Sequence, residues 1–284
     1  MMASRLRRLA AAVLFGAVMA GASGACGGAK FTVVDDAGAG DAAVDPGDAA
    51  TQDGLADVTE TSFCATRPGH LLCDDFDTRP AGDPQGNMLW DSFADTSATN
   101  GVINSAASVS PPRSFLASTT RPVMIGTTEE RVFLTKDVVH AKIVSLQFDI
   151  MVEAYGGGGT NPVVLVNIQF GLLGYDLVAF SPTALTFLET LSAADGGPGT
   201  ATSHPTSAGF PTGTWTHVAV ILNLPQMAMQ GSAAITLGNQ PTLQSQLTYM
   251  TPPSTGGTVS FGLLVTAAPA TWKIRYDNIV IDKN

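Results

Sequence analysis

The sequence predicts an all-β domain, a sandwich or a barrel, over residues 63–284. Short runs rich in β-branched and aromatic residues recur along this stretch, and clusters of Gly, Pro, Asn and Ser separate them. Several runs alternate apolar and polar residues with a period of two, which indicates strands with one buried face. A long amphipathic helix pattern is missing from the sequence. Many short strands joined by turns are typical of a sandwich or a barrel.

Two segments precede this domain. Residues 1–25 combine three arginines with an apolar run over residues 9–22, which is the pattern of an export signal peptide. The run is shorter than the roughly 20 apolar residues that a membrane-spanning helix needs. Residues 26–62 consist mostly of Ala, Gly, Asp and Thr, with few large apolar side chains. Such a segment buries too little surface to fold, so we expect a disordered acidic tether.

Residues 23–26 read SGAC and resemble the bacterial lipobox, in which small residues precede a cysteine that becomes lipidated. The resemblance implies a lipid on Cys26 and anchoring at the outer membrane or cell surface. The alternative is ordinary secretion, or a periplasmic protein, with cleavage nearby. The chain has 14 basic and 24 acidic residues, and the domain over residues 63–284 has no cluster of Lys and Arg. This balance argues against nucleic acid as a partner.

Eight runs within the domain are predicted strands. They are residues 142–153, 163–170, 176–180, 184–190, 215–224, 233–237, 259–266 and 272–282. The segment Ser181-Pro182-Thr183 between two of them predicts a hairpin turn. In the last run we expect unbroken alternation, which places Tyr276, Asn278 and Val280 on one face.

Four pieces of the domain resemble the concanavalin A-like superfamily, which includes laminin-G-like domains, legume lectins and some endoglucanases. They are SPPRSFLAS at 110–118, GTWTHVAVILNL at 213–224, AAITLGNQ at 233–240 and TWKIRYDNIVID at 271–282. With its acidic leader, the chain also resembles bacterial surface lipoproteins that bear such domains. The resemblance implies a two-sheet antiparallel jelly roll. It implies no activity, because this fold carries binding proteins and hydrolases alike.

The carboxylates of residues 142–153 are the first candidates for catalysis. Endoglucanases of this superfamily carry Glu-x-Asp-x-x-Glu on a strand, and the nearest segment here, FDIMVE, lacks the first glutamate. Asp149 and Glu153 share a strand face but lie roughly 13 Å apart on a regular strand. Glycosidases hold their two carboxyls within about 5–9.5 Å of one another. Asp149 and Glu153 are therefore the only catalytic candidates, and the sequence favours a non-catalytic domain.

Binding residues are predicted from position and from the resemblance. Trp90 and Tyr155 lie near predicted loops and are candidates for stacking on sugar rings. The resemblance also implies a structural calcium ion held by an aspartate of the closing strand, which Asp277 matches. Asp75 or Asp77 would add oxygen ligands, of which calcium takes six to eight.

Cys64 and Cys73 form an even pair once Cys26 is assigned to lipid. Eight residues separate them, unlike the tighter spacing of redox and zinc motifs, so we expect a structural disulfide rather than a metal or redox site. The acids after Cys73 alternate with Phe76 and predict the first strand of the domain.

The favoured function is a surface-anchored, lectin-like domain that binds carbohydrate or another extracellular ligand, such as a surface protein. One alternative is a polysaccharide-cleaving glycoside hydrolase with an atypical site. The other is a structural adhesion or envelope protein.

Overall fold

The computed structural model describes residues 62–84, 89–120, 129–156, 162–194, 199–206, 208–226, 229–250, 255–265 and 271–284. The predicted signal peptide and the predicted tether up to residue 61, including Cys26, lie outside the described residues. Within the described ranges, no helix has both the length and the apolar character needed to cross a bilayer.

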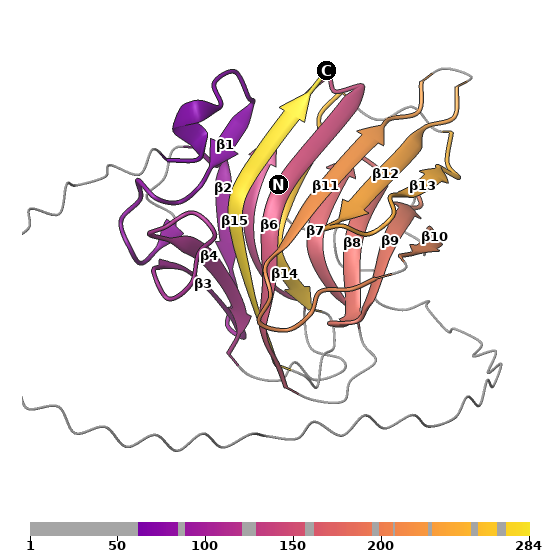
Figure 1. Ribbon diagram of the computed structural model, residues 1–284. Coiled ribbons are helices and arrows are strands. Elements are labelled where there is room, and N and C mark those ends of the chain that lie inside the picture. Colours follow the sequence, from indigo (N-terminus) through magenta and orange to yellow (C-terminus); the bar gives the residue numbers. More distant parts are fainter. Residues whose placement is uncertain are drawn as a thin grey trace, which may run out of the picture. The chain divides into compact units, whose positions relative to one another are not determined.

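Two antiparallel sheets pack face to face in the described part of the chain, with sheet A in front of sheet B in Figure 1. Sheet A has the order β13-β12-β11-β6-β15-β4-β3, and β1 also pairs with β15. Sheet B has the order β10-β9-β8-β7-β14-β5-β2. This arrangement confirms the predicted all-β sandwich of the jelly-roll type.

The strand bounds are as follows. Sheet A contains β1 (Leu72–Asp74), β3 (Thr99–Asn104), β4 (Ser114–Thr119), β6 (Ile143–Gly156), β11 (Thr216–Asn223), β12 (Ser232–Leu237), β13 (Leu243–Gln246) and β15 (Thr271–Lys283). Sheet B contains β2 (Ser92–Asp95), β5 (Glu130–Asp137), β7 (Val163–Phe170), β8 (Leu173–Ser181), β9 (Ala184–Leu191), β10 (Thr200–Pro205) and β14 (Thr258–Val265). All eight predicted runs are strands, and β8 and β9 form the hairpin expected around Ser181-Pro182-Thr183.

Aromatic side chains from both sheets meet in the centre of the core. The rings of Phe148, Phe261 and Tyr276 are fully buried, and their centroids lie 5.0–6.3 Å apart. The Tyr276 hydroxyl lies 2.9 Å from the Leu165 carbonyl oxygen and 2.8 Å from that of Gly262, both in sheet B. Burial of each such ring contributes about 1.5–3 kcal/mol, so this cluster is a main attachment between the sheets.

A bulge interrupts β15 opposite β6. The register shifts between Asp277 and Val280, and Asn278 adopts a φ of 50°. The predicted unbroken alternation is therefore wrong beyond Asp277. One extra residue resets the faces, so Ile279 and Ile281 join the core while Val280 pairs with Gln147 on the opposite face.

The start of the domain is fixed to this same strand. Cys64 and Cys73 form the expected disulfide, and β1 pairs with the far end of β15 through Leu72 and Ile281. The prediction that the following acids continue a strand is wrong. The strand ends at Asp74, whose carboxylate accepts a hydrogen bond from the backbone N–H of Phe76, and Phe76 has a φ of 60°. A turn, rather than an extended segment, carries these acids.

Candidate functional site

A group of polar side chains occupies the outer face of sheet A, the face turned away from the core. We call it the outer-face cluster. It consists of Asn104, Ser110, Ser114, Asp149, Glu153, His217, Arg275, Asp277 and Asn278. Neighbouring strands β11, β6 and β15 place His217 opposite Asp149, and Asp149 opposite Asp277. Side chains on one row of adjacent strands point to the same face, which brings these groups together.

Asp149 connects a histidine and an amide within this cluster. Its Oδ1 lies 2.9 Å from His217 Nδ1, and its Oδ2 accepts a 2.8 Å hydrogen bond from Asn278 Nδ2. The His217 side chain remains 51% exposed. Because the carboxylate favours a proton on Nδ1, the other ring nitrogen, Nε2, is left as a hydrogen-bond acceptor on a half-exposed side chain. His217 is thus an oriented hydrogen-bond acceptor or proton acceptor.

Asp277 anchors a loop to the middle of sheet A. It is fully buried, and its Oδ2 accepts hydrogen bonds from the backbone N–H groups of Val109 (2.7 Å) and Ser110 (3.0 Å). Burial raises the pKa of Asp277 to about 7, against the effect of these donors, and the nearby charge of Asp77 raises it further. Since no part of Asp277 is exposed, it positions the loop and the neighbouring Asn278 rather than touching a ligand.

The carboxylate oxygens of Asp277 are engaged in hydrogen bonds in this structure. They accept from the backbone N–H groups of Val109, Ser110 and Asn278 and from the Ser110 hydroxyl, whereas a calcium ion would need such oxygens as its ligands. Asp75 is engaged by the hydroxyl of Ser62 and the backbone N–H of Cys64, and Asp77 accepts a backbone hydrogen bond from Arg113. Among the described residues, no group of three or more His, Cys, Asp or Glu is placed to hold a metal. Calcium binding by this chain stays a prediction.

Arg275 and Glu153 form the second part of the cluster. Arg275 Nε donates to Glu153 Oε2, and its Nη1 donates to Asn104 Oδ1 at 2.7 Å and to Ser114 Oγ at 3.2 Å. The Arg275 side chain is buried, so its charge is balanced inside the cluster. The two catalytic candidates have separate partners, because Asp149 faces His217 while Glu153 faces Arg275. The described contacts include no hydrogen bond between these two carboxylates.

The two predicted stacking residues lie elsewhere. Trp90 is 6% exposed, donates from Nε1 to Asp74 Oδ2 at 2.6 Å and packs edge-on against Phe261. Its ring belongs to the core, so the prediction that Trp90 stacks on a sugar is wrong. Tyr155 is half-buried and packs against Trp272, its cross-strand neighbour, with ring centroids 4.6 Å apart. Because Trp272 points into the core, Tyr155 lies on the side of sheet A opposite the cluster. Ligand binding by Tyr155 stays a prediction.

Sequence reasoning missed most of the cluster. The sequence analysis assigned no role to His217, and it placed Asn278 on the same face as Tyr276. One signal was present: Asp-Asn inside an apolar strand is unusual, because both residues are depleted in strands. The contacts of Asn104 and Ser110 depend on segments that lie about 170 residues away in sequence, as the 171-residue separation of Asn104 and Arg275 shows.

Comparison with known proteins identifies the fold. No protein-family model matches the chain, and no curated protein matches it. Two similar solved structures are an endo-β-1,4-glucuronan lyase from Trichoderma reesei and the cellulose induced protein Cip1. The lyase is 10% identical with a TM-score of 0.54, over 76% of this chain and 96% of the lyase. Cip1 is 13% identical with a TM-score of 0.53, over 75% of this chain and 97% of Cip1. At these identities the likeness shows a shared fold.

Proposed function

We propose that the outer-face cluster is a carbohydrate-binding site and that the domain acts as a lectin-like binder. The observation that carries this proposal is the bulge at Asn278. A non-glycine residue at positive φ is a local cost of order 1 kcal/mol, which the surrounding contacts must offset. Here the bulge aims the Asn278 amide at Asp149, which in turn orients His217. Bulges that redirect a side chain in this way are typical of functional sites.

The chemistry of the cluster suits sugar hydroxyls, which both donate and accept hydrogen bonds. His217 offers an exposed nitrogen, and Gln147 lies partly exposed one row further along β6. Because neighbouring residues already hold these side chains in place, the side chains lose little conformational entropy when a ligand binds. The two similar structures support the proposal, since one is named for cleaving glucuronan and the other for induction by cellulose.

The test is a glycan array followed by titration calorimetry on any polysaccharide that binds. We expect Asn278→Gly to weaken binding at least about tenfold, which corresponds to about 1.4 kcal/mol. Glycine accepts the positive φ, so this variant removes the amide without straining the bulge. The matched control is Gln244→Ala, at an exposed position on β13. Absence of binding to every glycan tested would refute the proposal.

A second candidate function is cleavage of a polysaccharide, and the His217–Asp149 pair favours it. A carboxylate that holds Nδ1 and leaves Nε2 exposed is the usual arrangement of a general base. Two routes are distinguishable by their products. Hydrolysis through Asp149 and Glu153 would release reducing ends without unsaturation and would be abolished by Glu153→Gln. Proton abstraction by His217 would create ultraviolet-absorbing unsaturated ends and would be abolished by His217→Ala. If the protein binds a glycan but releases neither product, only the binding function remains supported.

We further propose that the protein is anchored by lipid on Cys26 and carries the domain at the outer membrane or cell surface. The support is the sequence SGAC after a signal-like segment. Cell fractionation of wild type and Cys26→Ser tests it. We expect the wild type in the membrane fraction and the variant in the soluble one. Equal distribution of both would contradict lipid anchoring.

A further inference from the structure

A second polar cluster lies at the edge of the sandwich formed by β10 and β13, which end sheets B and A respectively (Figure 1). It contains Ser245 of β13, His204 of β10 and Glu189 of β9. Ser245 Oγ lies 2.7 Å from His204 Nδ1, and His204 Nε2 lies 3.8 Å from Glu189 Oε2. The order is hydroxyl, imidazole, carboxylate. This is the arrangement that activates a serine nucleophile.

The carboxylate of this cluster is held firmly inside the protein. Glu189 is fully buried and accepts hydrogen bonds from the backbone N–H groups of Thr248 (2.7 Å) and Tyr249 (2.9 Å). Burial raises the pKa of the neighbouring Tyr175 hydroxyl well above its usual value, and the charge of Glu189 raises it further. Burying a carboxylate costs stability unless hydrogen bonds or an opposite charge compensate, and these two donors supply part of that compensation. It is suited to stabilise a positive charge that forms on His204.

The histidine is also positioned by packing. Its ring lies against Phe187 with centroids 5.8 Å apart, and its side chain is 15% exposed. Among the described residues, His204 Nε2 is buried without a hydrogen-bond partner. Nε2 lies within ion-pair distance of the Glu189 carboxylate, and a proton on the ring would strengthen the attraction between the two groups. The Ser245 hydroxyl has one other acceptor, the carbonyl of Gln246 at the longer distance of 3.2 Å.

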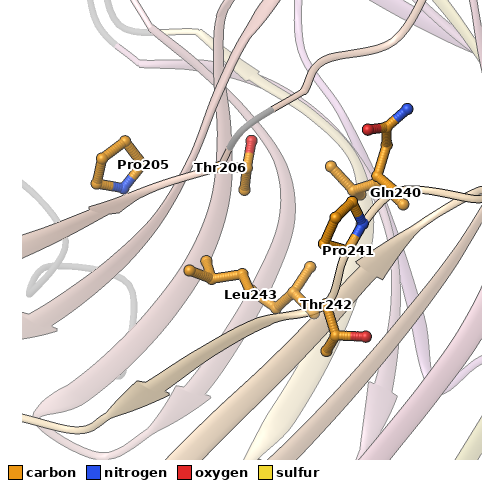
Figure 2. A pocket seen from close by; sticks show the side chains of 8 residues that line it. Pro205, Thr206, Gln240, Pro241, Thr242 and Leu243 are labelled. Carbon is orange, nitrogen blue, oxygen red and sulfur yellow. The ribbon is translucent and has the colours of Figure 1, made fainter.

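A cavity of about 230 Å³ lies at the same edge of the sandwich, between the end of β10, strand β12 and the turn that leads into β13 (Figure 2). Its walls include Pro205, Thr206, Ile235, Leu237, Pro241 and Leu243. Pro205 follows His204, and Leu243 is the same-face neighbour of Ser245, about 6.6 Å along the strand. Five of the eight lining residues are apolar and three are polar, namely Thr206, Gln240 and Thr242. The volume is below the 300–1,000 Å³ of typical ligand pockets. A short acyl chain fits this description better than a sugar ring.

We propose that Ser245 is the nucleophile of a carboxyl-ester hydrolase specific for short acyl groups, with His204 as its base and Glu189 as a positioning residue. Ser245 Oγ forms a bond to the carbonyl carbon while its proton moves to His204 Nδ1. The bond from that carbon to the alcohol oxygen breaks, and the alcohol leaves with the proton from His204. Water then repeats the sequence, releasing the carboxylic acid and restoring Ser245.

This site is separate from the outer-face cluster, so neither proposal depends on the other. The alternative is that the Ser245–His204 contact is only a hydrogen bond that joins the two sheets. The two interpretations differ in the reactivity of Ser245, because only an activated serine reacts with a fluorophosphonate.

The first experiment treats the purified full-length chain with a fluorophosphonate and locates the adduct by tandem mass spectrometry. We expect one adduct, on Ser245, and none after prior denaturation. Absence of an adduct on Ser245 in the folded protein would overturn the proposal. Because the labelling needs no variant, it does not depend on how a substitution affects folding.

The second experiment measures hydrolysis of p-nitrophenyl acetate. Ser245→Ala should lower the rate about 100-fold or more, while Ser203→Ala, an exposed serine beside His204 on β10, should leave it unchanged. Glu189→Gln should lower the rate about tenfold and move the alkaline limb of the pH profile, which a merely structural role would not do. Thermal melting of each variant establishes that it is folded. Equal rates for folded Ser245→Ala and wild type would overturn the proposal.

Discussion

Replacement of Asp277 by asparagine should change how the stability of the domain depends on pH. The pKa of Asp277 is raised to about 7 because the side chain is fully buried. An unfolded aspartate has a pKa of about 3.9. Between these values the native state keeps a proton that the unfolded chain has released. The stabilisation is fully present below about pH 4 and is lost as the pH rises towards 7.

The magnitude follows from linkage. One proton of difference changes the free energy of unfolding by about 1.4 kcal/mol per pH unit, so the window from pH 4 to pH 7 amounts to roughly 4 kcal/mol at most. The asparagine amide of the variant cannot ionise and resembles the protonated aspartate. The free energy of unfolding of Asp277→Asn relative to wild type should therefore rise by a few kcal/mol between pH 4 and pH 8. Asp176, whose pKa burial raises to about 6, adds a dependence of the same sign in both proteins.

Urea unfolding followed by tryptophan fluorescence measures this difference, with the disulfide kept intact. Trp90 and Trp272 are buried, so their emission reports loss of the core. The control is Asp137→Asn, an exposed aspartate at the end of β5 in sheet B. Parallel curves of stability against pH for wild type and Asp277→Asn would refute the reasoning.

Three further changes test the packing. Replacing both Cys64 and Cys73 by alanine should lower the free energy of unfolding by about 2–3 kcal/mol in the chain-entropy model, and an unchanged urea midpoint would contradict this. Gly262→Ala should cost about 3 kcal/mol or more, because Gly262 has a φ of 148° and a Cβ would overlap the Val132 carbonyl oxygen; a wild-type melting temperature would show that the backbone adapts. Tyr276→Phe should cost about 1–2 kcal/mol by removing the hydroxyl bonds to sheet B, measured by thermal melting.

The sequence predicts the central strands well, because their burial repeats at a fixed period. In β6 and β11 every second side chain enters the core, and the pattern needs no knowledge of the partner strands. The strands β2, β3, β4, β5, β10 and β13 lie outside the predicted runs. The residues of the edge strands β10 and β13 are mostly polar and exposed or half-buried, so these two strands carry little periodic signal and depend on neighbouring strands for their place.

The candidate sites were less predictable than the fold. Residue spacing along one strand identified Asp149 and Glu153, but the structure gives each a partner from a different strand. Local sequence also misplaced Trp90, because nothing near it indicates that Asp74 accepts its indole N–H. Ser245 and His204 meet only because two edge strands of different sheets come together. Such contacts depend on which strands become neighbours in the fold, and this cannot be read from the order of residues alone.

The position of β15 in the chain has a consequence for the timing of folding. This strand lies in the middle of sheet A and pairs with β6, β4 and β1, yet it is the last of the described strands to be synthesised. Until residues 271–283 arrive, β6 has no neighbour on one side and β1 has no partner at all. Before that point β1, β4 and β6 lack the neighbour that β15 supplies, which under the proposed export suits transport of an unfolded chain. A chain interrupted before Thr271 should therefore leave these three strands sensitive to protease.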